Sequence, residues 1–390
     1  MPDLHEWSNL LVRMAHFIAG IMWVGTSFYF VWLDSAFTPL AEKKEEVEGE
    51  LYMVHGGFFY RVEKRRFGAG RMPPDLHWFI WEATFTWITG FVLLWIVYYA
   101  SNGALLIDPA VHPFTQTQAT ICGLSFLAGG WVLYDLLFRS PLGRTIWGNV
   151  AGLALAGGAV WLLTHTFSGR GAFIHLGAMF GTIMVLNVWV HILPNQRAII
   201  AAAQAGQEPD YELGKKAKRR SMHNSYMTLP VLFTMISNHF ASLYGHAMNW
   251  LLLILVIIVG AFIRHIMITA KKWPLIPALG GLAVLMAMTA PRSAAVLTAT
   301  GPKVKFAEAY AIMQTRCYAC HSAHPTDDMF KIAPNGVMFD TPERAKAFAP
   351  RIYERAVTQK TMPFLNKTGM LDAEREVLGR WVAQGASVTD

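Results

Sequence analysis

The chain has 390 residues, of which 54% are hydrophobic and only 15% are charged. This balance is too apolar for an ordinary water-soluble protein, and the 14 tryptophans suit a bilayer protein with anchors at the interface. The net charge of +7 does not indicate nucleic acid binding, because the basic residues gather in a few loops between apolar runs.

Eight apolar runs are long enough to cross a bilayer, which takes about 20 residues in a helix. In chain order they are Leu10–Leu33, His77–Tyr99, Thr120–Phe138, Gly148–Phe167, Phe173–Leu193, Ser225–Tyr244, Asn249–Ile268 and Trp273–Thr289. The last run has Pro274 and Pro277 near its start, where a helix tolerates proline. The pattern predicts an all-α fold in which residues 1–290 form an eight-helix transmembrane bundle.

The composition changes after the last of these runs. Residues 291–302 are predicted to form a linker, and residues 303–390 are polar, with no further run that could span. This segment of roughly 90 residues is large enough for a small water-soluble domain. Its final part, Leu371–Gly385, has an apolar stripe at helical spacing, which indicates a helix packed into the core of that domain.

The loop charges predict the orientation in the membrane. Lysines and arginines follow the first, third, fifth and seventh runs, whereas the alternate loops hold almost none, with Arg170 as the exception. Loops rich in basic residues stay in the cytoplasm. We therefore expect a multi-pass protein of the bacterial inner membrane, with the N-terminus and the C-terminal domain in the periplasm.

The C-terminal domain carries the most specific motif of the chain, T-R-C-Y-A-C-H at Thr315–His321. Cys317 and Cys320 have the spacing that attaches one haem covalently, and His321 is placed as its axial iron ligand. Half of a zinc site would need a second ligand pair, but only His324 follows nearby. A redox dithiol would lie near a βαβ pattern, which is missing. The motif thus predicts a small α-helical cytochrome c domain with one haem c.

The second axial ligand is predicted to be a methionine, which raises the reduction potential. Met362 precedes Pro363 in the loop-like stretch K-T-M-P-F-L-N and is the first choice. Met329, Met338 and Met370 are the alternatives.

Four histidines fall in the outer third of the predicted helices: His16, His165, His175 and His239. Ionisable residues at bilayer depth are costly and are functional candidates by default. Two of these four could hold a b-type haem or another metal that passes electrons to haem c. The alternative is that they form hydrogen bonds between helices.

A second layer of histidines falls at the inner ends: His77, His191, His223 and His265. His175 and His191 are 16 residues apart, which places their side chains on nearly opposite faces of a helix at about 100° per residue. The spacing therefore disfavours two stacked haems.

The inner half also carries three charged residues, Glu82, Asp135 and Arg264. Buried charges are normally paired, so Arg264 with Asp135 or Glu82 is one interpretation. The other is a pocket in which Arg264 clamps a planar anion, since a guanidinium reads such an edge with two hydrogen bonds. Further edge contacts would then come from Asn187, Asn195 and Gln196.

Several strings of the chain resemble the membrane-bound urate oxidases that carry a urate oxidase N-terminal domain fused to cytochrome c. They are V-H-G-G-F-F-Y (54–60), H-L-G-A-M-F-G-T-I-M-V-L-N-V (175–188), T-M-I-S-N-H-F (234–240) and the C-Y-A-C-H haem motif. The resemblance covers essentially the whole chain. It implies oxidation of urate to 5-hydroxyisourate, with electrons leaving through haem c to a cytochrome c acceptor or terminal oxidase and without local peroxide formation.

Within that function the residues take expected roles. Glu82, Asp135 or an inner histidine is the candidate general base, and Arg264 with Asn187 is the candidate substrate clamp. Two other functions remain open. An electron-relay or anchor subunit would need no anion-binding residues of its own, and a transporter would favour repeated halves with broken helices.

Overall fold

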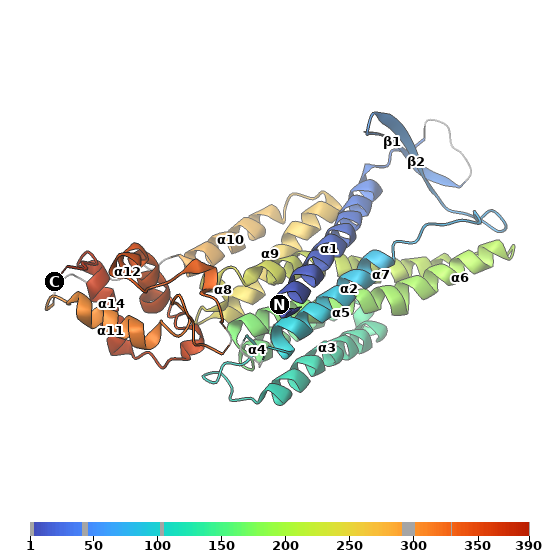
Figure 1. Cartoon of the computed structure of the whole chain (residues 1–390). Helices are drawn as coiled ribbons and strands as arrows, with labels where there is room; N and C mark the ends of the chain where they lie inside the picture. The colour runs from blue at the N-terminus through green and yellow to red at the C-terminus, as the bar shows by residue number, and fades with distance from the viewer. Residues whose placement is uncertain (1–3, 41–45, 102–104, 291–300, 329, 390) are drawn as a thin grey trace. The chain divides into compact units, whose positions relative to one another are not determined.

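The computed structural model describes residues 4–40, 46–101, 105–290, 301–328 and 330–389. The chain is mostly helical and divides into two compact units (Figure 1). The first comprises Met1–Ile107, Val111–Ile236 and Trp250–Val284. The second comprises Asp108–Ala110, Ser237–Asn249 and Leu285–Asp390. Most of the predicted linker lies outside the described residues.

Within the described part of the chain, six helices are long and apolar enough to cross a membrane. Such helices are compatible with a multi-pass membrane protein. They are α1 (Leu4–Ala36), α2 (Trp81–Leu94) with its π-helical end η1 (Trp95–Tyr99), α3 (Gln116–Arg139), α4 (Ile146–Thr164), the continuous α5 (Gly169–Leu186), η3 (Asn187–Ile192) and α6 (Leu193–Gln204), and α9 (Asn249–Thr269).

The other two predicted spans differ from the prediction. The run Ser225–Tyr244 is divided between α7 (Tyr211–Ser237) and the short α8 (Ala241–Tyr244). Helix α7 begins before the apolar run and includes the basic segment Lys215–Arg220. Lysine and arginine are good helix formers, so the basic residues continue the helix instead of forming a loop. The run Trp273–Thr289 gives α10 (Leu275–Thr289), which is apolar but has only 15 residues.

The first inter-helix connection contains a β-hairpin that the sequence analysis had assigned to a loop. Strands β1 (Val47–His55) and β2 (Phe58–Arg65) are antiparallel, and His55 pairs with Phe58. Gly56 and Gly57 have φ angles of 60° and 83°, as a two-residue turn with both central residues in the left-handed region requires. The Gly-Gly pair between two strand-like runs was the available signal.

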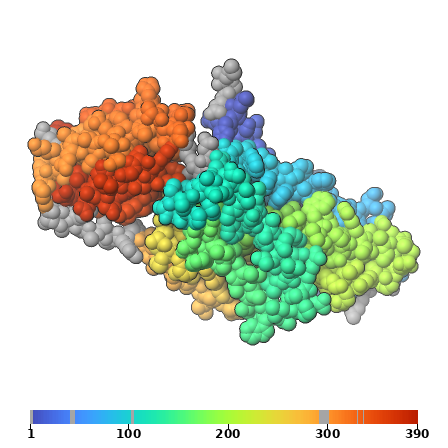
Figure 2. Space-filling model, turned by 90° about the horizontal axis from the view of Figure 1, so that it is seen from below, coloured from blue at the N-terminus to red at the C-terminus, as the bar shows by residue number. Residues whose placement is uncertain are grey.

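Helix α5 is the most buried helix of the first unit, and α2, α3 and α4 pack against it. Small residues allow close approach: a Cβ at Gly177 of α5 would lie 2.1 Å from Thr234 Oγ1 of α7. α1 packs against α2. Residues of α3 and of the segment that follows it, teal to green, lie on the face shown in Figure 2. Polar residues on α2, α3 and α5 are therefore held on closely packed helices.

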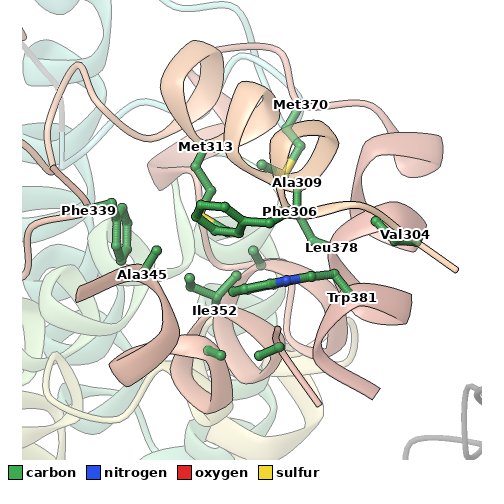
Figure 3. Close-up of a cluster of buried hydrophobic side chains, with 13 residues drawn as sticks. Val304, Phe306, Ala309, Met313, Phe339, Ala345, Ile352, Met370, Leu378 and Trp381 are labelled. Atoms are coloured by element: carbon green, nitrogen blue, oxygen red, sulfur yellow. The ribbon is translucent and has the colours of Figure 1, made fainter. Parts of the chain in front are cut away.

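The second unit contains a small helical segment with its own apolar core (Figure 3). Helices α11 (Phe306–Arg316) and α14 (Asp372–Ala383) pack against each other, and Met313 and Trp381 lie fully buried between them. The remaining turns are short: η4 (Pro334–Gly336), α12 (Pro342–Ala347), α13 (Ala349–Ile352), η5 (Tyr353–Thr358) and η6 (Phe364–Asn366). The predicted final helix is thus present.

Candidate functional site

Asp135 of α3 is the centre of a buried ionic cluster. The residue is 7% exposed, and its Oδ1 accepts hydrogen bonds from Arg220 Nη2 at 2.9 Å and from His191 Nε2 at 2.6 Å. Its Oδ2 lies 2.6 Å from Arg139 Nε. Asp135 therefore joins α3 to α7 and η3, and it forms ion pairs with Arg220 and Arg139 and not with Arg264.

Asn187 extends this cluster across the bundle. Its Nδ2 donates to Tyr134 Oη at 2.9 Å and to Asn224 Oδ1 at 2.8 Å, and Tyr134 Oη lies 2.8 Å from His223 Nδ1. Asn187 and His191 both lie on the π-helix η3, a distortion that is frequent at functional sites. The structure does not join Asn187 to Arg264, because the amide is already engaged here.

Arg264 of α9 is fully buried, with 0% exposure. Its guanidinium lies 4.0 Å from the centre of the Phe28 ring, and its nearest polar contact is Ser27 Oγ at 3.5 Å. Arg264 Nε has no hydrogen-bond partner. No ion pair joins Arg264 to a carboxylate of the described residues. Buried charges in proteins are normally paired, so an arginine in this position is unusual.

Glu82 of α2 is half-buried, and its Oε2 is a buried atom without a hydrogen-bond partner. One turn along α2, Thr86 contacts α1, because His16 Nδ1 lies 3.0 Å from the Thr86 carbonyl. Among the described residues no ion pair joins Glu82 to Arg264, which contacts Ser27 of α1. Glu82 is therefore a separate candidate in the same unit.

Three of the four outer histidines, His16, His165 and His175, have a polar protein contact. His175, fully buried, has Nδ1 2.7 Å from the Gly171 carbonyl and Nε2 2.7 Å from Tyr99 Oη. His165 bonds its own helix through the Trp161 carbonyl and is exposed, as is His239. Among the described residues, no group of three or more His, Cys, Asp or Glu could hold a metal ion. Of these contacts, His175 with Tyr99 and His16 with the Thr86 carbonyl join two helices.

In the second unit, the predicted haem residues lie at the edge of the apolar core. Cys317 and Met362 both pack against that core, and the two thiols of Cys317 and Cys320 are free. His321 donates from Nδ1 to the Val337 carbonyl at 3.0 Å, which leaves Nε2 as the ligand atom. Burial lowers the pKa of His321, so the imidazole is neutral, as iron ligation requires.

The thiol chemistry differs from that of a redox dithiol. Burial raises the pKa of Cys317 to about 12 and that of Cys320 to about 11. Reactive dithiols have lowered pKa values instead. The residues present therefore fit covalent attachment to haem better than thiol exchange.

Met362 is held in place by the final helix. Arg375 of α14 is 5% exposed and donates from Nη1 to the Met362 carbonyl at 2.7 Å and to the Ala356 carbonyl. Of the alternatives, Met370 is buried in the apolar core, Met338 accepts a contact from Arg344, and Met329 lies outside the described residues. Among the described candidates, Met362 is the methionine whose carbonyl accepts a hydrogen bond from the buried Arg375, and it packs against the same core as Cys317.

Comparison with known proteins adds a family to this geometry. The family model described as urate oxidase N-terminal matches residues 2–294. The chain belongs to the urate oxidase N-terminal family. Neither a curated protein nor a solved structure matches the chain.

The match to the urate oxidase N-terminal family covers the whole first unit, including Glu82, Asp135 and Arg264. It supports an oxidoreductase of urate-related chemistry with helices that suit a membrane. The residues predicted to bind haem c lie beyond residue 294, outside the match.

Arg220 and Asn224 belong to the Asp135–Asn187 network, although neither was predicted as a site residue. Both lie on one face of α7, four residues apart, and both are buried. Arg220 was counted as a loop charge because the predicted span began at Ser225. The signal that could have found it is the phase shared by Arg220, Asn224 and Thr228.

Proposed function

We propose that this chain oxidises urate to 5-hydroxyisourate within its membrane-spanning unit and passes the electrons to a haem c in a C-terminal cytochrome c domain. The observation that carries the proposal is Arg264, a fully buried guanidinium without a carboxylate partner, in a chain of the urate oxidase N-terminal family. Urate at neutral pH is a planar monoanion, so its charge and shape suit this position.

In the proposed site, Arg264 binds the anionic edge of the purine. A buried charge is strongly unfavourable without a counter-ion, and a bound urate would supply one. The Phe28 ring holds the guanidinium from one side and leaves its edge for hydrogen bonds. Asp135 and Asn187 are proposed to maintain the arrangement of α3, η3 and α7, because their polar atoms already have protein partners.

Glu82 is the proposed general base. Urate and water together lose two electrons and two protons to give 5-hydroxyisourate. A carboxylate with a buried oxygen free of hydrogen bonds can accept one of these protons when it lies at the depth of the substrate. Packed helices exclude bulk water from the intermediate and strengthen these interactions.

The proposed cytochrome c domain receives the electrons. Cys317 and Cys320 would attach haem c, and His321 Nε2 and the Met362 sulfur would be its axial ligands. When bound, haem c accepts electrons one at a time, so each urate needs two transfers. His321 is oriented by the Val337 carbonyl and Met362 by Arg375.

The loop charges support the proposed location in the bacterial inner membrane, with this domain in the periplasm. Electrons would continue to a soluble or membrane-bound cytochrome c or terminal oxidase, and no peroxide would form at the urate site. An electron relay without a substrate site is the competing function, and the half-buried Glu82 and the buried Arg264 argue against it.

The experiment measures urate binding and turnover in Arg264→Met and Arg264→Lys. Without urate, we expect Arg264→Met to unfold at the same temperature as the native protein or higher, because an unpaired buried charge is removed. Urate should no longer raise that temperature, and KM should rise at least tenfold, about 1.4 kcal/mol. Arg264→Lys should fall between.

Arg220→Met is the matched control, since Arg220 is equally buried but paired with Asp135. It should lower the unfolding temperature. If Arg264→Met is destabilised to the same degree and still binds urate normally, Arg264 is structural. If urate fails to reduce the haem of the native protein, the relay function is favoured.

A further inference from the structure

A large cavity lies in the first unit between α3, α4, α5, α7 and α9, and neither Glu82 nor Arg264 lines it. Its volume is about 1530 Å³. Along α3 its wall extends from Cys122 to Phe138, ~24 Å at 1.5 Å per residue. This exceeds half of the hydrocarbon core of a bilayer, ~15 Å. The cavity therefore has the length of a lipid chain and not that of a compact solute.

The two tyrosine side chains in the cavity wall, Tyr134 and Tyr226, already form hydrogen bonds with histidines. Tyr134 Oη lies 2.8 Å from His223 Nδ1, and Tyr226 Oη lies 2.6 Å from His265 Nδ1. Most other wall residues are apolar. A neutral ligand recognised by its carbonyl groups, such as a quinone, would find both tyrosine hydroxyls engaged. The wall favours hydrocarbon.

The end of the cavity at which α3 finishes is basic. Arg144, Lys218 and Arg219 line it. Lys218 shares Asp34 with Lys64, whereas Arg144 and Arg219 form no ion pair with a carboxylate of the described residues. The opposite end, near Cys122 and Leu162, has no charged residue in its wall. The charge is thus one-sided, as the binding of an amphiphile with an anionic head requires.

We propose that this cavity binds one anionic phospholipid from the leaflet on the side of Arg144 and Arg219. The phosphate would lie against these two arginines, and an acyl chain would lie along α3 and α4. Trp147, 67% exposed at the start of α4, is suited to the headgroup region. The lipid would link α4 to α7 and α9, and the proposal does not depend on the function of the urate site.

The test uses the purified full-length protein in neutral detergent. Phosphatidylglycerol, phosphatidylcholine or inorganic phosphate is titrated, while native mass spectrometry counts bound lipid and thermal unfolding measures stabilisation. We expect one phosphatidylglycerol to bind at least tenfold more tightly than phosphatidylcholine, and phosphate alone to have no effect. In Arg144→Gln/Arg219→Gln the preference should fall below threefold.

Arg61→Gln/Arg66→Gln changes two arginines outside the cavity, one in β2 and one directly after it. This matched control should keep the preference for phosphatidylglycerol over phosphatidylcholine. Gly158→Leu tests the cavity without altering charge. Gly158 lines the cavity and has open space around its Cβ position, so leucine would fill the space and weaken phosphatidylglycerol binding at least tenfold. Equal binding of both lipids, a preference that survives in Arg144→Gln/Arg219→Gln, undiminished phosphatidylglycerol binding in Gly158→Leu, or stabilisation by a neutral quinone instead of phosphatidylglycerol would overturn the proposal.

Discussion

Asp135 compensates the buried guanidinium of Arg220 and also accepts a hydrogen bond from the half-buried imidazole of His191. In Asp135→Asn the carboxylate is lost, and Arg220 keeps a charge that is only 6% exposed to solvent. Breaking such a pair from one side typically costs about 3–5 kcal/mol. We therefore expect a clear fall in the unfolding temperature of Asp135→Asn, measured in detergent by tryptophan fluorescence.

Asp34→Asn is the control for this prediction. Asp34 also pairs with two cations, Lys64 and Lys218, but its side chain is 44% exposed. Exposed pairs contribute about 0–1 kcal/mol, so the unfolding temperature should hardly change. Equal effects of the two variants would mean that burial of the Asp135 cluster is unimportant.

The sequence could identify buried charges but not their partners. Glu82, Asp135 and Arg264 stand out in apolar runs, where a charge is costly. Which of them meet depends on the rotation of each helix about its axis, and composition does not determine that rotation. Arg220 was the missing partner of Asp135, and its burial follows from the early start of α7.

At the scale of helices, Gly123 determines how closely α3 approaches its neighbours. A Cβ at Gly123 would lie 2.6 Å from Tyr99 Oη and 2.7 Å from His175 Nε2, so Gly123→Ala must separate these groups or move α3. Overpacking of this kind costs about 1–3 kcal/mol. We expect Gly123→Ala to lower the unfolding temperature measured in detergent.

Gly129→Ala is the matched variant on the same helix. No atom lies within 4 Å of its Cβ position, and alanine favours a helix over glycine by up to about 1 kcal/mol. Its unfolding temperature should stay the same or rise. A loss of stability in both variants would show that the helix cannot accept any side chain, and close packing at Gly123 would not be the reason.

The start of α14 gives a prediction about pH. Burial acts to raise the pKa of Glu374, but hydrogen bonds from the Leu371 backbone and from Arg316 prevail and lower it below 4.5. A lowered native pKa stabilises the folded state above the unfolded value and loses this effect as pH falls through the native value. Glu374→Gln should therefore destabilise the second unit by about 1 kcal/mol at pH 7.

This difference should shrink as the pH falls from 4.5 through the lowered native pKa, where the carboxylate of the folded protein also becomes protonated. The measurement is urea unfolding of the full-length protein followed by the fluorescence of Trp381 and its neighbours at several pH values. Glu376→Gln, on the exposed face of the same helix, should show no such pH dependence. A constant difference between pH 7 and pH 3 would contradict the role of the Glu374 charge.

Helices were easier to predict than their ends or their exceptions. Apolar runs marked the helices because bilayer depth requires about 20 such residues. The start of α7 was not predicted, since a helix can continue beyond the apolar run into basic residues. The hairpin escaped as well, because strand pairing depends on the turn at Gly56 and Gly57 and not on composition.

At the scale of the whole molecule, two kinds of information were independent. The C-x-x-C-H motif predicts its ligand residues from local spacing, and the structure leaves His321 Nε2 and both thiols available. The urate site has no comparable local motif. Glu82 and Arg264 come from helices far apart in sequence, and no local spacing relates them.

The coupling of the two units is testable with the thiols removed. In the native protein, we expect urate to reduce the haem and produce the c-type band in a reduced-minus-oxidised spectrum. Full-length Cys317→Ser/Cys320→Ser should still be stabilised by urate, because Arg264 and Glu82 are unchanged. Its urate turnover with an external cytochrome c acceptor should fall at least 100-fold, since electrons can no longer leave through the haem. Retained urate binding distinguishes this result from misfolding, and undiminished turnover would mean that the electrons take a route that avoids the C-terminal cysteines.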